Sequence, residues 1–166
     1  VCSSAASDVY KRQSLFIFFP LIRLISKSFY EKKILPYVLN LTCNSRPIDY
    51  QRKKVIPEAS GKVLEIGIGP GSNLKHYDNQ KVTSILGIDP SEELNQIAQK
   101  RAKKNNLNVE FLIESASSLS VESNSIDTVV STYALCSIPE PQKTLQEIRR
   151  VLKDDGVFIF SEHGLS

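Results

Sequence analysis

The stretch from Val63 to Gly71, VLEIGIGPG, constrains the fold more than any other part of the chain. An apolar run ends at a carboxylate, and glycines follow at every second position, at Gly67, Gly69 and Gly71. This pattern is typical of a parallel strand that leads through a glycine turn into a helix, here expected over 71–77. Glycine adopts backbone conformations that are unfavourable for other residues, and its lack of a side chain lets a ligand approach the main chain. The helix N-terminus would offer its unpaired N–H groups to that ligand. The stretch therefore predicts a nucleotide-type binding site.

Length and composition limit the number of domains and the kinds of partner that we expect. With 166 residues, the chain has room for one domain with a substantial core. Its net charge of +3 is too small to indicate a nucleic-acid partner, and we expect none. Three cysteines (Cys2, Cys43 and Cys136) and two histidines share no metal-like spacing, so we expect reduced thiols, a cytoplasmic location and no metal site.

The first 58 residues are expected to precede the main domain. Residues 1–13 are rich in Ser and Ala and begin with Val in a sequence without Met, so we interpret them as a non-native or disordered leader. Residues 15–25 are strongly apolar but shorter than the roughly 20 residues that span a membrane. Two interpretations stay open for them: a lid helix over the site, or a segment in peripheral contact with a membrane. Residues 14–58 are thus predicted to form an N-terminal helical cap or lid.

From residue 59 to 166, short β-rich runs alternate with helical ones. The expected strands cover 62–66, 82–88, 109–113, 126–132 and 157–161. Helices are expected after Ser91, which would cap its helix, and from Pro141, while 48–55 would form a basic helix after an extended stretch at 43–47. Strands alternating with helices predict an α/β fold, a Rossmann-like doubly wound parallel sheet.

Ligands of such sheets bind beyond the carboxyl ends of the strands. Asp89 ends the second expected strand and lies 22 positions after Gly67. This matches an acidic residue that accepts hydrogen bonds from ribose hydroxyls, although Asp89 could also cap the next helix. Glu65 would put a negative charge near a pyrophosphate, which argues against a nicotinamide dinucleotide. A carboxylate there favours a cation, and S-adenosylmethionine carries a sulfonium, an amino group and no phosphate.

Four segments in this order resemble class I S-adenosylmethionine-dependent methyltransferases: VLEIGIGPGSNL, GIDPSEEL, SIDTVVSTYALCSIPEP and LQEIRRVLKDDGVFIFSEHG. The last two are similar to those of small bacterial methyltransferases related to the methyltransferase-like thiol methyltransferases. The resemblance covers the chain from about Tyr30 to the end and implies S-adenosylmethionine as the cofactor. It also implies a sheet of seven strands, of which this chain would contain five.

The resemblance implies a role for each matching position. The three glycines would approach the methionine part of the cofactor, and Glu65 would organise their turn. Asp89 would hold the ribose hydroxyls and Pro90 would lie near the adenine. The family's Gly-Asp-Ala after the third strand is Glu114-Ser115-Ala116 here, so Ser115, followed by Ala116, would accept from the adenine amino group without a charge.

Two further positions lie where the methyl group would be. Thr132 and Tyr133 end the fourth strand and would face the methyl group, which makes Tyr133 a candidate catalytic residue. His163 follows the fifth strand. It is a candidate general base, with a substrate contact or a purely structural histidine as open alternatives.

These positions predict in-line methyl transfer to S, N or O of a small hydrophobic or lipid-like acceptor. Residues 16–37 together with Tyr133 would form the acceptor pocket. A cofactor-binding fragment without catalysis is the first alternative, and an NAD-binding oxidoreductase is the second. The chain is expected to be a monomer or an oligomer of unknown size.

Overall fold

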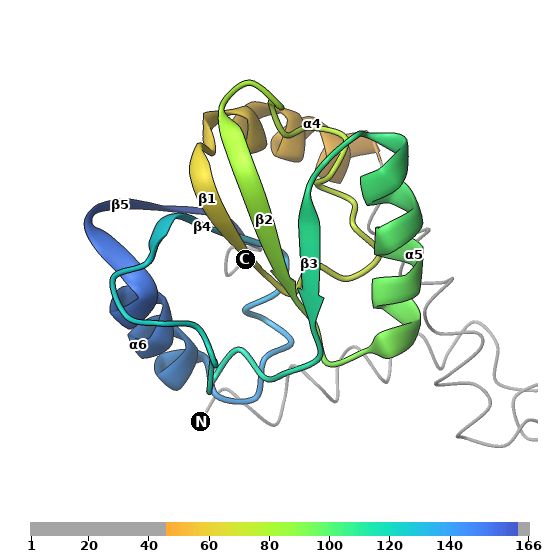
Figure 1. Ribbon diagram of the computed structural model, residues 1–166. Coiled ribbons are helices and arrows are strands. Elements are labelled where there is room, and N and C mark those ends of the chain that lie inside the picture. Colours follow the sequence, from red (N-terminus) through yellow and green to blue (C-terminus); the bar gives the residue numbers. More distant parts are fainter. Residues whose placement is uncertain (1–45, 163–166) are drawn as a thin grey trace, which may run out of the picture.

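The computed structural model describes residues 46–162 (Figure 1). Its elements in chain order are α4 (Arg46–Val55), the short 3-10 helix η2 (Ile56–Glu58), β1 (Gly61–Ile66), β2 (Val82–Ile88), α5 (Glu92–Lys104), β3 (Val109–Leu112), β4 (Ile126–Thr132), α6 (Pro141–Val151) and β5 (Leu152–Ser161). The predicted leader and the apolar segment 15–25 lie outside the described residues. Within residues 46–162, no helix has the length and apolar character needed to cross a membrane.

The strands form one sheet in the order β3-β2-β1-β4-β5. All four pairings are parallel, so the carboxyl ends of the strands meet at one edge. The chain runs outward from β1 through β2 to β3 and then crosses back to β4 on the other side of β1. The strand order thus reverses between β1 and β4, where open α/β sheets bind their ligands. The predicted Rossmann-like parallel sheet is confirmed, with β2 and β4 at the predicted bounds.

Helices cover both faces of the sheet: α4 and α5 lie on one side and α6 on the other (Figure 1). The side chains of each strand alternate between these layers. On β1, Val63 packs in the cluster that contains Ala98 of α5, whereas Leu64 packs in the cluster that contains Ile148 of α6. Burial on both faces explains why the strands are continuous apolar runs rather than alternating ones.

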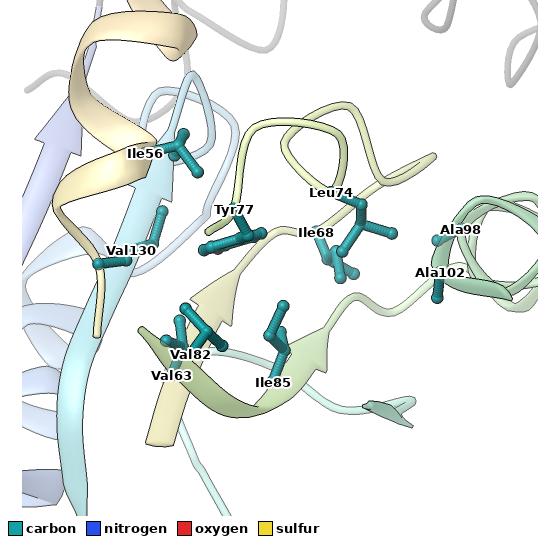
Figure 2. Packing of buried hydrophobic residues seen from close by; sticks show 11 residues of the cluster. Ile56, Val63, Ile68, Leu74, Tyr77, Val82, Ile85, Ala98, Ala102 and Val130 are labelled. Atoms are coloured by element: carbon teal, nitrogen blue, oxygen red, sulfur yellow. The ribbon is translucent and has the colours of Figure 1, made fainter. Parts of the chain in front are cut away.

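The first of these clusters includes the segment that follows β1. Figure 2 shows Tyr77 of this segment between Val130 and Ile56 on one side and Ile68 and Leu74 on the other. Ile56 is fully buried, so η2 belongs to the core of the sheet domain although it was predicted as part of the cap. The division into leader, cap and main domain otherwise stays a prediction.

The predicted helix over 71–77 is wrong. The segment is a series of turns, in which Gly71 N donates to Ile68 O (2.9 Å) and His76 N donates to Asn73 O (2.8 Å). Gly71, the first residue of this range, has a positive φ angle of 76°, which a right-handed helix does not allow. The described residues therefore place no helix N-terminus directly after the glycines.

Two element boundaries also differ from the prediction by more than one residue. α4 begins at Arg46 rather than at residue 48, because Pro47 is tolerated in the first turn of a helix, where its missing N–H has no partner to lose. β5 begins at Leu152 rather than Val157, and its register with β4 is irregular between these two residues. α5 begins as predicted, with the Ser91 hydroxyl accepting from Leu94 N.

Candidate functional site

Asp89 and the glycine turn meet at the carboxyl edge of the sheet. Asp89 is 8% exposed. Its Oδ2 accepts from Gly69 N at 3.0 Å and its Oδ1 from Ser91 N at 2.9 Å. Burial raises the pKa of Asp89, and these two hydrogen bonds oppose the shift. A carboxylate is thus held between the turn after β1 and the start of α5.

The three glycines of the turn have different surroundings. A Cβ at Gly67 would lie 2.6 Å from the Ala134 side chain, and one at Gly71 would lie 2.6 Å from the Leu74 side chain. At Gly69 the nearest atoms would be 3.8 Å away or more, and one of them is Oδ2 of Asp89 at 4.0 Å. Gly67 and Gly71 are therefore required for packing, whereas the missing side chain of Gly69 leaves space beside Asp89. That space fits the close approach of a ligand.

Glu65 holds the segment after β1 from inside the protein. It is 1% exposed, and its carboxyl accepts from Asn73 Nδ2 at 2.9 Å and from the Tyr77 hydroxyl at 2.7 Å. Burial raises the pKa of Glu65 from 4.5 to about 7, although both hydrogen bonds and the charge of Arg52 oppose the shift. Glu65 thus connects β1 to two side chains of the segment that follows it, and its role in organising the turn stays a prediction.

The network continues to β4. Asn73 Nδ2 also donates to Thr132 Oγ1 at 3.0 Å. From α4, the buried Arg52 places its guanidinium carbon 5.3 Å from the centre of the Tyr133 ring, within the range of a cation–π interaction. Side chains from α4, β1 and β4 therefore meet at the point where the strand order reverses.

The backbone after β4 turns sharply at Tyr133, whose φ of 55° is uncommon for a bulky residue. Tyr133 N donates to Ser161 O at 2.9 Å. One oxygen of Glu162, at the end of β5, accepts from the amides of Ala134 and Leu135, each at 3.1 Å. β5 and the residue after it thus stabilise this turn.

A second contact attaches α4 to the glycine segment. Oδ1 of Asp49 lies 2.6 Å from Lys75 Nζ and 2.9 Å from His76 Nε2. The hydrogen bond from Lys75 is the main cause of a lowered pKa of Asp49. α4 is therefore joined to the site both by this cluster and by Arg52.

The remaining predicted residues are less closely connected. Pro90 and Ser115 are exposed, and the Ser115 hydroxyl contacts that of Ser117 at 2.8 Å in its own loop. Ala116 is buried in the cluster on the α6 face. Cys136 is exposed. His163 and residues 16–37 lie outside the described part of the chain.

Sequence reasoning did not find three members of the network: Arg52, Asn73 and Tyr77. Asn73 and Tyr77 are four residues apart, so one side of the predicted helix would have carried both polar groups. That spacing could have indicated a shared partner. Arg52 gave no such signal, because Lys53 and Lys54 beside it have the same charge. Only the structure shows that Arg52 is buried and that the two lysines are exposed.

With this geometry in view, comparison with known proteins decides the family. A family model described as a methyltransferase domain matches residues 64–160. The chain belongs to this family. The predicted enzyme class and its cofactor, S-adenosylmethionine, are thereby confirmed at the level of the family, and the nicotinamide-dependent alternative falls away.

Three proteins illustrate the similarity. The mitochondrial methyltransferase OMS1 of Saccharomyces cerevisiae is 30% identical over 82% of this chain and 33% of its own length. Human thiol S-methyltransferase TMT1B is 32% identical over 80% of this chain and 59% of its own. The structure of a SAM-dependent methyltransferase from Aquifex aeolicus matches 79% of this chain and 77% of its own, with 23% identity and a TM-score of 0.63, which shows the shared fold. The chain spans less than two thirds of the length of each of these two relatives.

Proposed function

We propose that this protein transfers a methyl group from S-adenosylmethionine to a small hydrophobic or lipid-like acceptor, and that the acceptor atom is a thiol sulfur. One observation carries the proposal: the space left by Gly69 beside the buried Asp89, at the point of strand reversal in a methyltransferase-family sheet. Oxygen and nitrogen acceptors remain alternatives for the test.

The described residues divide the work of holding the cofactor. The Asp89 carboxylate would accept from the ribose hydroxyls, and the turn at Gly69 would hold the methionine part. Pro90, Ser115 and Ala116 would hold the adenine. Glu65 is buried and would not contact the cofactor. It would instead stabilise the turn through its hydrogen bonds with Asn73 and Tyr77.

When bound, S-adenosylmethionine supplies a methyl group on a positively charged sulfur, a leaving group that needs no further activation. The protein's contribution is to hold the acceptor in line, and such orientation can supply up to about 7–11 kcal/mol. Thr132 and Tyr133 border the acceptor side of the site at the end of β4. A thiol must also lose its proton, and His163 remains the predicted base.

Two observations support a thiol on a small apolar molecule. Human TMT1B, which resembles most of this chain, is named a thiol S-methyltransferase. Residues 16–37, the predicted cover of the site, are largely apolar and aromatic. Peripheral contact of residues 15–25 with a membrane, and a cytoplasmic location, stay predictions. A fragment that binds the cofactor without catalysis is the alternative.

Calorimetric titration of S-adenosylmethionine and S-adenosylhomocysteine into the full chain tests the cofactor. We expect one-to-one binding, weakened by Asp89→Ala by about tenfold or more, which corresponds to 1.4 kcal/mol. The matched control is Asp154→Ala, which removes an exposed carboxylate after α6. This substitution should leave the affinity for S-adenosylmethionine unchanged. A folded wild-type chain that binds neither ligand would contradict the proposal.

The acceptor is tested with a radiolabelled methyl group and three probes of similar shape: thiophenol, phenol and aniline. We expect label in the thioether from thiophenol and little in the other two products. Label in anisole or N-methylaniline instead would assign an oxygen or nitrogen acceptor. Binding without transfer to any probe would favour the non-catalytic alternative.

A further inference from the structure

Arg52 is unusual among the basic residues of α4. Its side chain is 4% exposed, whereas Lys53 and Lys54, which follow it, are exposed. A charged side chain is costly to bury unless nearby groups compensate its charge. The helix therefore turns one specific cation toward the sheet, and its surroundings indicate what that cation does.

Two groups at the site face Arg52. Its guanidinium carbon lies 5.3 Å from the centre of the Tyr133 ring. Its positive charge also acts on the carboxyl group of Glu65, where it partly opposes the increase in pKa that burial causes. Glu65 belongs to β1 and Tyr133 follows β4, so the guanidinium acts on one residue from each of the two strands between which the strand order reverses.

Tyr133 is fixed from its backbone as well as from its ring. Its N–H donates to Ser161 O, and Glu162 holds the next two amides. These bonds maintain a φ of 55°, which sets the direction in which the side chain leaves the backbone. Arg52 then fixes the ring face, so both the backbone and the ring of Tyr133 have a defined position.

We propose that Arg52 is a positioning residue that holds the Tyr133 ring as a wall of the acceptor pocket. This inference rests on the proposed methyl transfer. Arg52 acts through Tyr133 and not on the cofactor. A planar guanidinium stacks on an aromatic ring better than a lysine ammonium does, so Arg52→Lys preserves the charge but not the full contact.

The first test separates acceptor binding from cofactor binding. In Arg52→Met we expect kcat/KM for thiophenol to fall about tenfold, mostly through KM, while the Kd of S-adenosylmethionine changes less than about threefold. Arg52→Lys regains part of the loss. Lys54→Met is the matched control, because Lys54 lies 4.3 Å from the Tyr50 ring on the same helix, with Tyr50 exposed, and should change neither constant.

A double-mutant cycle tests the route through Tyr133. Tyr133→Leu should produce a loss similar to that of Arg52→Met, and the double variant should be no worse than either single one. Losses that multiply would overturn the inference. So would a loss of cofactor affinity in Arg52→Met as large as its loss of kcat/KM. Circular dichroism spectra and thermal unfolding establish that each variant is folded.

A measurement on the ligand-free chain is independent of activity. Carbon NMR of the Glu65 carboxyl group follows its titration, in an environment where Tyr77 and Asn73 donate to it and Arg52 supplies the positive charge. Arg52→Met should raise the midpoint and Lys54→Met should not. An unchanged midpoint would overturn the placement of Arg52 even if the wild type proved inactive, whereas failure to bind S-adenosylmethionine would overturn only the proposed function.

Discussion

Glu65 illustrates at the residue scale how burial alters the chemistry of a side chain. A carboxyl group with hydrogen bonds from Tyr77 and Asn73 would ordinarily have a lowered pKa, but desolvation dominates and raises it to about 7. The opposite holds for Asp49 and Asp127, whose hydrogen bonds from lysines lower their pKa values. The difference follows from exposure, because only Glu65 is removed from water.

The raised pKa of Glu65 predicts a pH-dependent stability. The folded state binds the proton more tightly than the unfolded state, so this contribution is fully present below pH 4.5 and is lost as the pH rises to about 7. The lost free energy of unfolding is about 3 kcal/mol. Glu65→Gln should flatten this dependence in urea unfolding between pH 4.5 and 8.

Asp89 provides the control for that experiment, because burial raises its pKa as well. Asp89→Asn should leave most of the pH dependence of stability in place. The ordinary pKa of Asp89, 3.8, is lower than that of Glu65, and hydrogen bonds from two amides oppose its increase. If Glu65→Gln retains the wild-type slope, Glu65 is not the group that titrates.

At the scale of elements, the segment between β1 and β2 determines the shape of the site. It is a series of turns whose form depends on positive φ angles at Gly69 and Gly71 and on hydrogen bonds to Glu65. Its apolar residues pack into the core below the site. The same segment therefore contributes to the core, and under the proposed function it also holds the ligand, with different glycines for the two tasks.

Substitution of single glycines should separate the two tasks. Gly67→Ala places a Cβ 2.6 Å from Ala134 in the protein core, so we expect a loss of stability of about 2 kcal/mol or more. Gly69→Ala meets no atom closer than 3.8 Å, so its loss should be about 1 kcal/mol, from backbone strain alone. Affinity for S-adenosylmethionine should nevertheless fall in Gly69→Ala. Thermal unfolding and calorimetry on both variants provide the comparison, and equal stability losses would contradict it.

At the scale of the whole molecule, β5 is the last strand of the sheet within the described residues. Val157 and Phe160 are 54% and 59% exposed, so this edge strand presents large apolar side chains to solvent. Such edges can pair with another copy of the same chain and promote aggregation.

Val157→Lys should therefore reduce aggregation of this chain without a large loss of stability. Ile159→Lys is the matched control on the same strand, because Ile159 packs against the core cluster on the α5 face and its substitution should destabilise the fold. Light scattering at increasing concentration and thermal unfolding distinguish the two. An unchanged onset of scattering in Val157→Lys would show that this edge does not drive association.

Much of the architecture could be predicted because its causes are local. Continuous apolar runs identified the strands, Ser91 identified the start of α5, and Pro141 that of α6. The position of Asp89 beside the glycine turn followed from spacing, because parallel strands bring their carboxyl ends to one edge. The turns over 71–77 could not be predicted in this way, since their cause is a carboxyl group on β1 and a glycine conformation that sequence periodicity does not reveal.

The sequence alone determined the parallel sheet, its family and the edge at which the site lies, because strand patterns, glycine spacing and chain order are properties of neighbouring residues. Tertiary structure decided which lysine or arginine of α4 is buried, which polar groups share the Glu65 carboxyl, and which glycine leaves space for a ligand. Those outcomes depend on desolvation and on contacts between residues far apart in the chain, such as Arg52 with Tyr133. Folding brings such groups together, and only then do their charges and shapes act on one another.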